Sequence, residues 1–346
     1  MSSYFKIASK VIFLFLTPFL LLYFALFFDL FGKHQEKAKV QEFFNPSLGS
    51  HANIEDEKII LFGDLHVHTT YSLDAFLGNL PILEGEGTHP VSDACNFARF
   101  CANLDFFSVN DHAEFLTRRE WIDTIESLKN CSEISSEVDE SGIIPFLGWE
   151  WTQDSLNIKD HYGHKNVVLR SLYDNIPDRP IGAPDHKFFK SIVYAPSYAL
   201  FGAMLYDYEN MSDYFNYRQR QLIIRNLEFC DDDVHVKDLP LDCLERAEQP
   251  SDLYRKLDEW ETDSLVIPHG SAWGNTSPPM ASWMNQLDAK NHNPKYQNLI
   301  EIFSGHGNTE EFRAWEEFNE VDGKYACPAP TLNYLPECFQ AGEIIR

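Results

Sequence analysis

The feature that most constrains this chain is the stretch from Ile59 to Thr69, IILFGDLHVHT. A short apolar run, rich in β-forming residues, leads into Asp64, His66 and His68 at two-residue intervals. Side chains alternate between the two faces of a strand, so this spacing predicts that one carboxylate and two imidazoles point the same way. Histidines two residues apart also occur on ordinary polar strand faces, so the motif needs support from the rest of the chain.

Later segments repeat this association of strand-like runs with metal-binding residue types. They contain Asp111 and His112 after LDFFSVN, Glu150 in IIPFLGWEW, His164 at the start of GHKNVVL, His269 in SLVIPHG, and Glu301 and His306 in LIEIFSGHG. Helix-like segments alternate with these runs, which predicts an α/β fold with a parallel sheet or barrel. Barrels of this class build their active sites at the carboxyl ends of the strands.

The collected candidates are all imidazoles and carboxylates, with no thiolate among them. They are His66, His68, His112, His164 and His269, with Asp64, Asp74, Asp111, Glu150 and Glu301. Such a set suits zinc, manganese or iron, and its size indicates more than one ion. Two neighbouring ions that share an activated hydroxide are well suited to hydrolyse phosphoesters.

The net charge of the chain limits the classes of partner that we expect it to bind. Acidic residues number 53 against 28 basic ones, which gives a net charge of -25. This excess disfavours nucleic-acid surfaces, so we expect no nucleic acid and a small-molecule substrate, although the charge also simply favours solubility. The sequence contains no P-loop, G-x-S-x-G or dinucleotide-binding motif.

An apolar run near the N-terminus predicts a membrane helix. Residues 11–31 read VIFLFLTPFLLLYFALFFDLF, after Lys6 and Lys10, and about 20 apolar residues suffice to cross a bilayer. We expect residues 1–32 to form a single-pass signal anchor in the lipid bilayer rather than a cleaved signal peptide. The catalytic domain would then lie on the extracytoplasmic side.

The remaining chain divides into a polar tether at 33–58 and one domain at 59–346. Within the domain, about 170–245 forms an aromatic-rich insertion, which is either a subdomain with its own small core or a lid that shapes the substrate site. Cys230 with Cys243, and Cys327 with Cys338, are close enough in sequence to close short disulfide loops. Cys95 and Cys101 fall on a helical pattern and could equally be small core residues.

The motifs GDLHVHTTYSLD, SVNDH, GWE, GHKN and IPHG, in this order, resemble those of the PHP superfamily, named for polymerase and histidinol phosphatase. The closest resemblance is to a branch catalogued as a domain of unknown function. The resemblance implies a distorted (β/α)7-type barrel with two or three divalent metal ions at its C-terminal rim. It implies as metal ligands His66, His68, His112, Glu150 as the bridging carboxylate, His164 and His269. Asp74 resembles the aspartate of the first motif's loop, one residue later than usual.

One departure from that pattern concerns the end of the chain. The superfamily closes with an Asp-x-His motif, and nothing after His306 supplies it, while Asp233-Val234-His235 has the spelling but precedes His269. We infer a C-terminally incomplete sequence or a chain that has lost this motif, with a barrel left incomplete.

The leading hypothesis is a membrane-anchored, metal-dependent phosphoesterase with Asp74, Asp111, Glu301 and His306 as catalytic residues. One alternative is a catalytically weak binding or sensor protein that lacks the last metal motif. Another is a metal-dependent amidohydrolase, which normally needs a lysine at a strand end.

Overall fold

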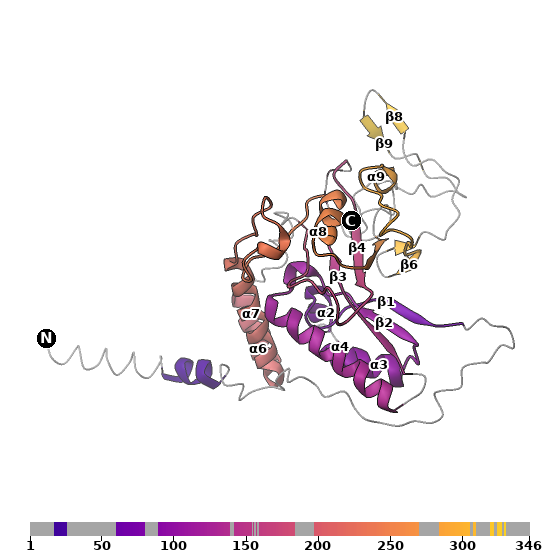
Figure 1. The fold of residues 1–346 in the computed structure, drawn as a ribbon. Helices are drawn as coiled ribbons and strands as arrows, with labels where there is room; N and C mark the ends of the chain where they lie inside the picture. The colour runs from indigo at the N-terminus through magenta and orange to yellow at the C-terminus, as the bar shows by residue number, and fades with distance from the viewer. Residues whose placement is uncertain are drawn as a thin grey trace, which may run out of the picture.

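The structure is a computed structural model. It describes residues 17–25, 60–79, 89–138, 142–153, 155, 157, 159–183, 197–269, 284–304, 307–308, 319–321, 324–326 and 329. Its centre is a five-stranded sheet in the order β1-β2-β3-β4-β5 (Figure 1). The strands are β1 (Gly63–Val67), β2 (Phe106–Val109), β3 (Ile144–Trp151), β4 (His164–Leu169) and β5 (Ser264–His269).

The sheet is mixed, because β4 runs antiparallel to both of its neighbours while β1, β2 and β3 are parallel. Parallel neighbours need a crossover of a dozen or more residues, usually a helix. The described residues between β3 and β4 form no helix, so the chain returns directly in the opposite direction. The prediction of a (β/α)7-type barrel is therefore wrong, and the described residues form a curled half-barrel instead.

The curl brings the two edges of the sheet towards each other. The side-chain amide of Asn166 on β4 donates a 3.3 Å hydrogen bond to the carbonyl of Leu65 on β1. The rings of His66 on β1 and His269 on β5 have centroids 4.3 Å apart. The two edge strands thus meet at one end of the sheet without pairing as strands.

Helices α3 (Val91–Phe100) and α4 (Arg118–Val138) pack on one face of the sheet. The core beneath them contains Trp121, Trp149 and Trp151, all fully buried. Each indole N–H donates to a backbone carbonyl, so these large side chains are buried without losing a hydrogen bond. Cys95 of α3 is buried and forms a disulfide with Cys131 of α4, whereas Cys101 is exposed and forms no disulfide in the described residues.

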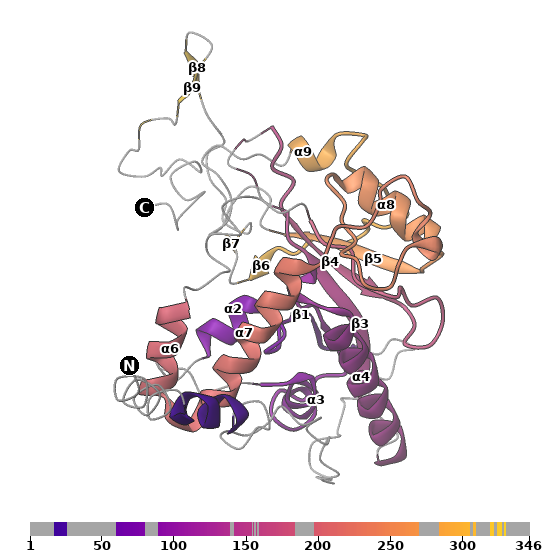
Figure 2. The same cartoon turned by 90° about the vertical axis from the view of Figure 1, so that its left-hand side faces the viewer.

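A second layer consists of α2 (Leu73–Gly78), α6 (Ser197–Tyr206) and α7 (Met211–Asn226), shown together in Figure 2. Phe76 of α2 stacks on Tyr217 of α7 with centroids 4.4 Å apart. The aromatic insertion thus shares a small core with the helix that follows β1. Cys230 and Cys243 form the expected disulfide, whereas Cys327 and Cys338 lie outside the described residues.

The other described elements are short, apart from α8. They are η2 (Ala113–Phe115), η3 (Tyr208–Asn210), η4 (Val236–Asp238), α8 (Pro250–Glu259), α9 (Met284–Leu287), β6 (Phe303–Ser304), β7 (Gly307–Asn308), β8 (Asn319–Val321) and β9 (Lys324–Ala326). The β6–β7 and β8–β9 pairs form separate two-stranded sheets.

The predicted single-pass membrane anchor is wrong. Across the part of the chain that the structure describes, no helix combines the length and apolar character needed to span a bilayer. Of the predicted segment, residues 17–25 are helical and the rest lies outside the described residues. Leu22 of this helix packs on the core of the second layer, and the rings of Tyr23 and Phe215 are 5.9 Å apart. Part of the apolar sequence therefore contacts protein.

Candidate metal centre

The candidate site is organised around Glu150, a fully buried residue near the end of β3. Nitrogen atoms of five histidines lie close to its carboxylate oxygens. The nitrogen to oxygen distances are 2.6 Å for His164, 2.9 Å for His68, 3.2 Å for His269, and 3.5 Å for both His66 and His112. The structure thus brings all six predicted metal ligands together.

The topology of the sheet explains this convergence. His66 is near the end of β1, His112 and Glu150 pair as an isolated bridge just beyond β2, and His269 ends β5. His164 instead begins its strand, and because β4 is antiparallel, its first residue lies at the same edge, directly opposite His269. The unusual position of His164 in the sequence therefore follows from the direction of β4.

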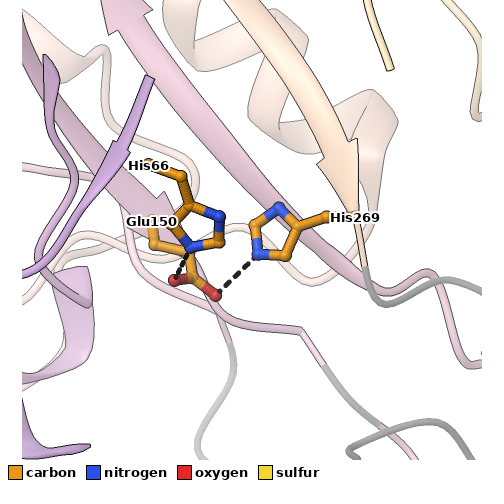
Figure 3. A group of neighbouring side chains, drawn as sticks. All are labelled: His66, Glu150 and His269. Carbon is orange, nitrogen blue, oxygen red and sulfur yellow. Dashed lines mark hydrogen bonds and ion pairs between the residues drawn. The ribbon is translucent and has the colours of Figure 1, made fainter. Parts of the chain in front are cut away.

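The side chains form two groups that share Glu150. The ligand atoms of His66, Glu150 and His269 lie within 4.8 Å of one another, and Figure 3 shows both rings facing the carboxylate. His68, His112 and Glu150 form the second group under the same limit. Two ligands that each lie about 2.0–2.2 Å from one ion are roughly 3–3.5 Å apart. The distances to Glu150 therefore suit metal coordination.

The charges at the site are strongly coupled. Burial alone would raise the pKa of Glu150, but the surrounding histidines outweigh it and hold the pKa well below its usual range. Burial alone would lower the pKa of His66, but Glu150 and Glu301 outweigh it and raise the pKa to about 9. Burial dominates at His269 and lowers its pKa to about 4. The ionised Glu150 carboxylate therefore lies among histidines whose pKa values are shifted in opposite directions.

The chemistry of these donors fits a divalent cation. Imidazole nitrogen and carboxylate oxygen without thiolate are ligands of zinc, manganese and iron. Nε2 of His68 and Oε2 of Glu150 are buried and 2.9 Å apart, yet neither has a hydrogen-bonding partner of suitable geometry in the described residues. A buried imidazole nitrogen and a buried carboxylate oxygen in this arrangement fit two ligands of one metal ion better than they fit a direct hydrogen bond. These His and Glu groups could bind a metal ion.

Two predicted catalytic carboxylates lie behind the histidines rather than beside Glu150. Both oxygens of Asp74, in the first turn of α2, are 3.1 Å from Nδ1 of His68. Oε2 of Glu301 is 2.6 Å from Nδ1 of His66. Burial would raise the pKa of Asp74, but His112 and His68 lower it below its usual range, so the carboxylate stays ionised.

The other predicted residues take different positions. Asp111 is buried and accepts hydrogen bonds from the backbone N–H of Thr69 at 2.6 Å and its hydroxyl at 2.7 Å, so it anchors the loop after β1. Asp64 is exposed and accepts a bond from the N–H of His66, because an irregularity in β1 breaks the expected alternation. His306 lies outside the described residues.

Sequence reasoning missed three residues that support the site. The hydroxyl of Ser72 contacts Nδ1 of His68 at 3.2 Å and accepts a bond from the N–H of His112. The Thr152 hydroxyl contacts Nδ1 of His112, and Glu114 accepts from the N–H of Thr152. Thr152 lies two residues after Glu150, so strand alternation could have placed its side chain on the same face as that of Glu150. Ser72 and Glu114 carried no comparable signal.

Comparison with protein families gives one match. A family model described as "Protein of unknown function (DUF3604)" matches residues 55–142, a minor part of the chain that includes His66, His68 and His112. Neither the curated proteins nor the solved structures contain a match. The family model thus covers three of the five histidines around Glu150 and names no activity.

Proposed function

We propose that this protein is a metal-dependent hydrolase that holds two divalent ions, zinc, manganese or iron, and cleaves a phosphoester in a small molecule. The observation that carries the proposal is the convergence of five histidines on the single buried carboxylate of Glu150. When bound, the ions would supply Lewis-acid catalysis and lower the pKa of a water molecule.

The side chains have distinct roles in this proposal. His66 and His269 would hold one ion and His68 and His112 the other, and Glu150 belongs to both groups. His164, whose Nδ1 is 2.6 Å from Oε1 of Glu150, lies outside both groups and orients the shared carboxylate.

Asp74 lies where the His68 side of the site meets solvent. Its side chain is 51% exposed, whereas that of His68 is 11% exposed. Burial would raise the pKa of Asp74, but His112 and His68 outweigh it, so the carboxylate is ionised beside the His68 ring.

The position of Lys165 bears on the alternative of a metal-dependent amidohydrolase, which normally needs a lysine at a strand end. Lys165 follows His164 on β4, so alternation directs its side chain to the opposite face of the sheet. Its buried Nζ donates to the carbonyl of Tyr162 at 2.7 Å and to Gln286 at 2.9 Å. It therefore does not supply the lysine that amidohydrolase chemistry needs, and the resemblance to PHP proteins supports the same choice.

A double substitution tests the proposal. His66→Ala with His68→Ala removes one ligand from each group, so we expect loss of bound metal and at least about a thousandfold loss of phosphoesterase activity. The readouts are elemental analysis and a phosphomonoester and phosphodiester screen on protein purified from metal-supplemented medium. His292→Ala, an exposed histidine distant in sequence, is the matched control.

Two results would contradict the proposal. Wild-type protein that contains no metal after metal supplementation would remove the proposed ions. Wild-type protein that retains metal but hydrolyses none of the phosphoesters would instead leave a metal-binding protein of another function.

A further inference from the structure

We propose that Glu301 is a positioning residue that orients His66 towards the ion held with His269, without being a ligand itself. The inference rests on the metal centre proposed above and assigns a function to a carboxylate outside both ligand groups. It concerns which of the two ring nitrogens of His66 is available to the ion.

The geometry at His66 separates the two nitrogens. Nδ1 is 2.6 Å from Oε2 of Glu301, whereas Nε2 faces Glu150 at 3.5 Å. A proton on Nδ1 that is donated to Glu301 leaves the lone pair of Nε2 for the ion. A carboxylate behind a metal-binding histidine fixes both its tautomer and its ring orientation.

The backbone holds Glu301 in this position. Its N–H donates to the carbonyl of Pro268, the residue that precedes His269 on β5, at 3.3 Å. The N–H of Val266 in turn donates to the carbonyl of Tyr296 at 3.0 Å, so the segment leading to Glu301 runs alongside β5. Glu301 is thereby fixed to one edge strand while its side chain reaches His66 on the other.

The second ligand group has the same arrangement. Nδ1 of His68 faces Asp74 at 3.1 Å, and its Nε2 faces Glu150 at 2.9 Å. In both groups a histidine at or just after the end of β1 presents Nε2 to the shared carboxylate and Nδ1 to a separate one. The repetition at two independent positions supports an orienting function for Glu301.

The test is a Co²⁺ titration of the full chain, followed by visible absorption and by metal analysis. We expect Glu301→Ala to weaken binding at one of the two positions by about 10–100-fold and to leave the other unchanged. Glu301→Gln should restore most of the affinity, because the amide oxygen can accept the same Nδ1–H. At saturating Co²⁺ the visible spectrum of Glu301→Gln should match the wild type, since the ligands are unchanged. Glu248→Ala, an exposed glutamate, is the control.

Three outcomes would overturn the inference. Unchanged affinity in Glu301→Ala shows that the contact with His66 has no orienting effect, while the metal centre itself stands. A Glu301→Gln variant that is as weak as Glu301→Ala and has an altered spectrum identifies Glu301 as a direct ligand. Wild-type protein that binds no Co²⁺ removes the metal centre and this inference together.

Discussion

At several buried residues of this protein, burial and neighbouring charges shift the pKa in opposite directions. At Glu150 the surrounding histidines outweigh burial and keep the carboxylate ionised. At Glu245 burial outweighs the neighbouring charges instead. Lys256 and Arg179 each lie 4.0 Å from its carboxylate, and the indole of Trp260 donates to it. Burial is the larger effect there and raises the pKa of Glu245 to about 7.

The raised pKa predicts how stability depends on pH. A carboxyl group with a pKa of about 7 in the folded protein and 4.5 when unfolded stabilises the protein fully below pH 4.5, and this contribution is lost as the pH rises through 7. Glu245→Gln removes the titration. Relative to that variant, the free energy of unfolding of the wild type should fall by on the order of 3 kcal/mol between pH 4.5 and pH 8.

Urea unfolding of both proteins at pH 5 and pH 8 checks this prediction. Glu248→Gln, at an exposed position, should show no pH-dependent difference from the wild type. An equal difference between wild type and Glu245→Gln at both pH values would mean that Glu245 is ionised throughout as the partner of Lys256.

The element that decides the geometry of the site is the antiparallel pair of β3 and β4. Gly148 lies in this pair, two residues before Glu150, and a Cβ atom there would be 2.5 Å from the carbonyl oxygen of Val167 on β4. It would also be 2.6 Å from the side-chain amide of Asn110. The close approach of the two strands therefore requires glycine at this position.

Gly148→Ala should force β3 away from β4 and displace Glu150. We expect a loss of about 1–3 kcal/mol in the free energy of unfolding, together with weaker binding at both metal positions. The matched control is Gly202→Ala on α6, where a Cβ would meet nothing within 4 Å. This substitution should raise the free energy of unfolding by about 0.5–1 kcal/mol. Urea unfolding and metal titration measure both effects, and a Gly148→Ala protein as stable as the wild type would contradict this account of the strand pair.

At the scale of the whole molecule, the sequence predicted the site better than the fold. The predicted ligand residues His66, His112, Glu150 and His269 could be brought together from sequence because residues at the carboxyl ends of strands share an edge whatever the number of strands. The direction of β4 could not be found, since an apolar run has no mark of direction and only the pairing with β3 and β5 determines it. Hydropathy likewise did not show that Leu22 and Tyr23 would pack against protein.

The half-barrel brings the two candidate ligand groups together at Glu150 near the end of β3. His66 and His269 come from the edge strands, His68 and His112 from loops after β1 and β2, and Glu150 from the strand between. Removal of a ligand from one group should therefore affect one ion, whereas removal of Glu150 should affect both.

The central claim is that Glu150 is the shared ligand of two metal positions, and metal stoichiometry tests it most directly. Elemental analysis after dialysis should give two divalent ions per chain for the wild type, one for His269→Ala and none for Glu150→Gln, with circular dichroism to verify that each variant is folded. A folded Glu150→Gln protein that retains two ions would contradict the claim.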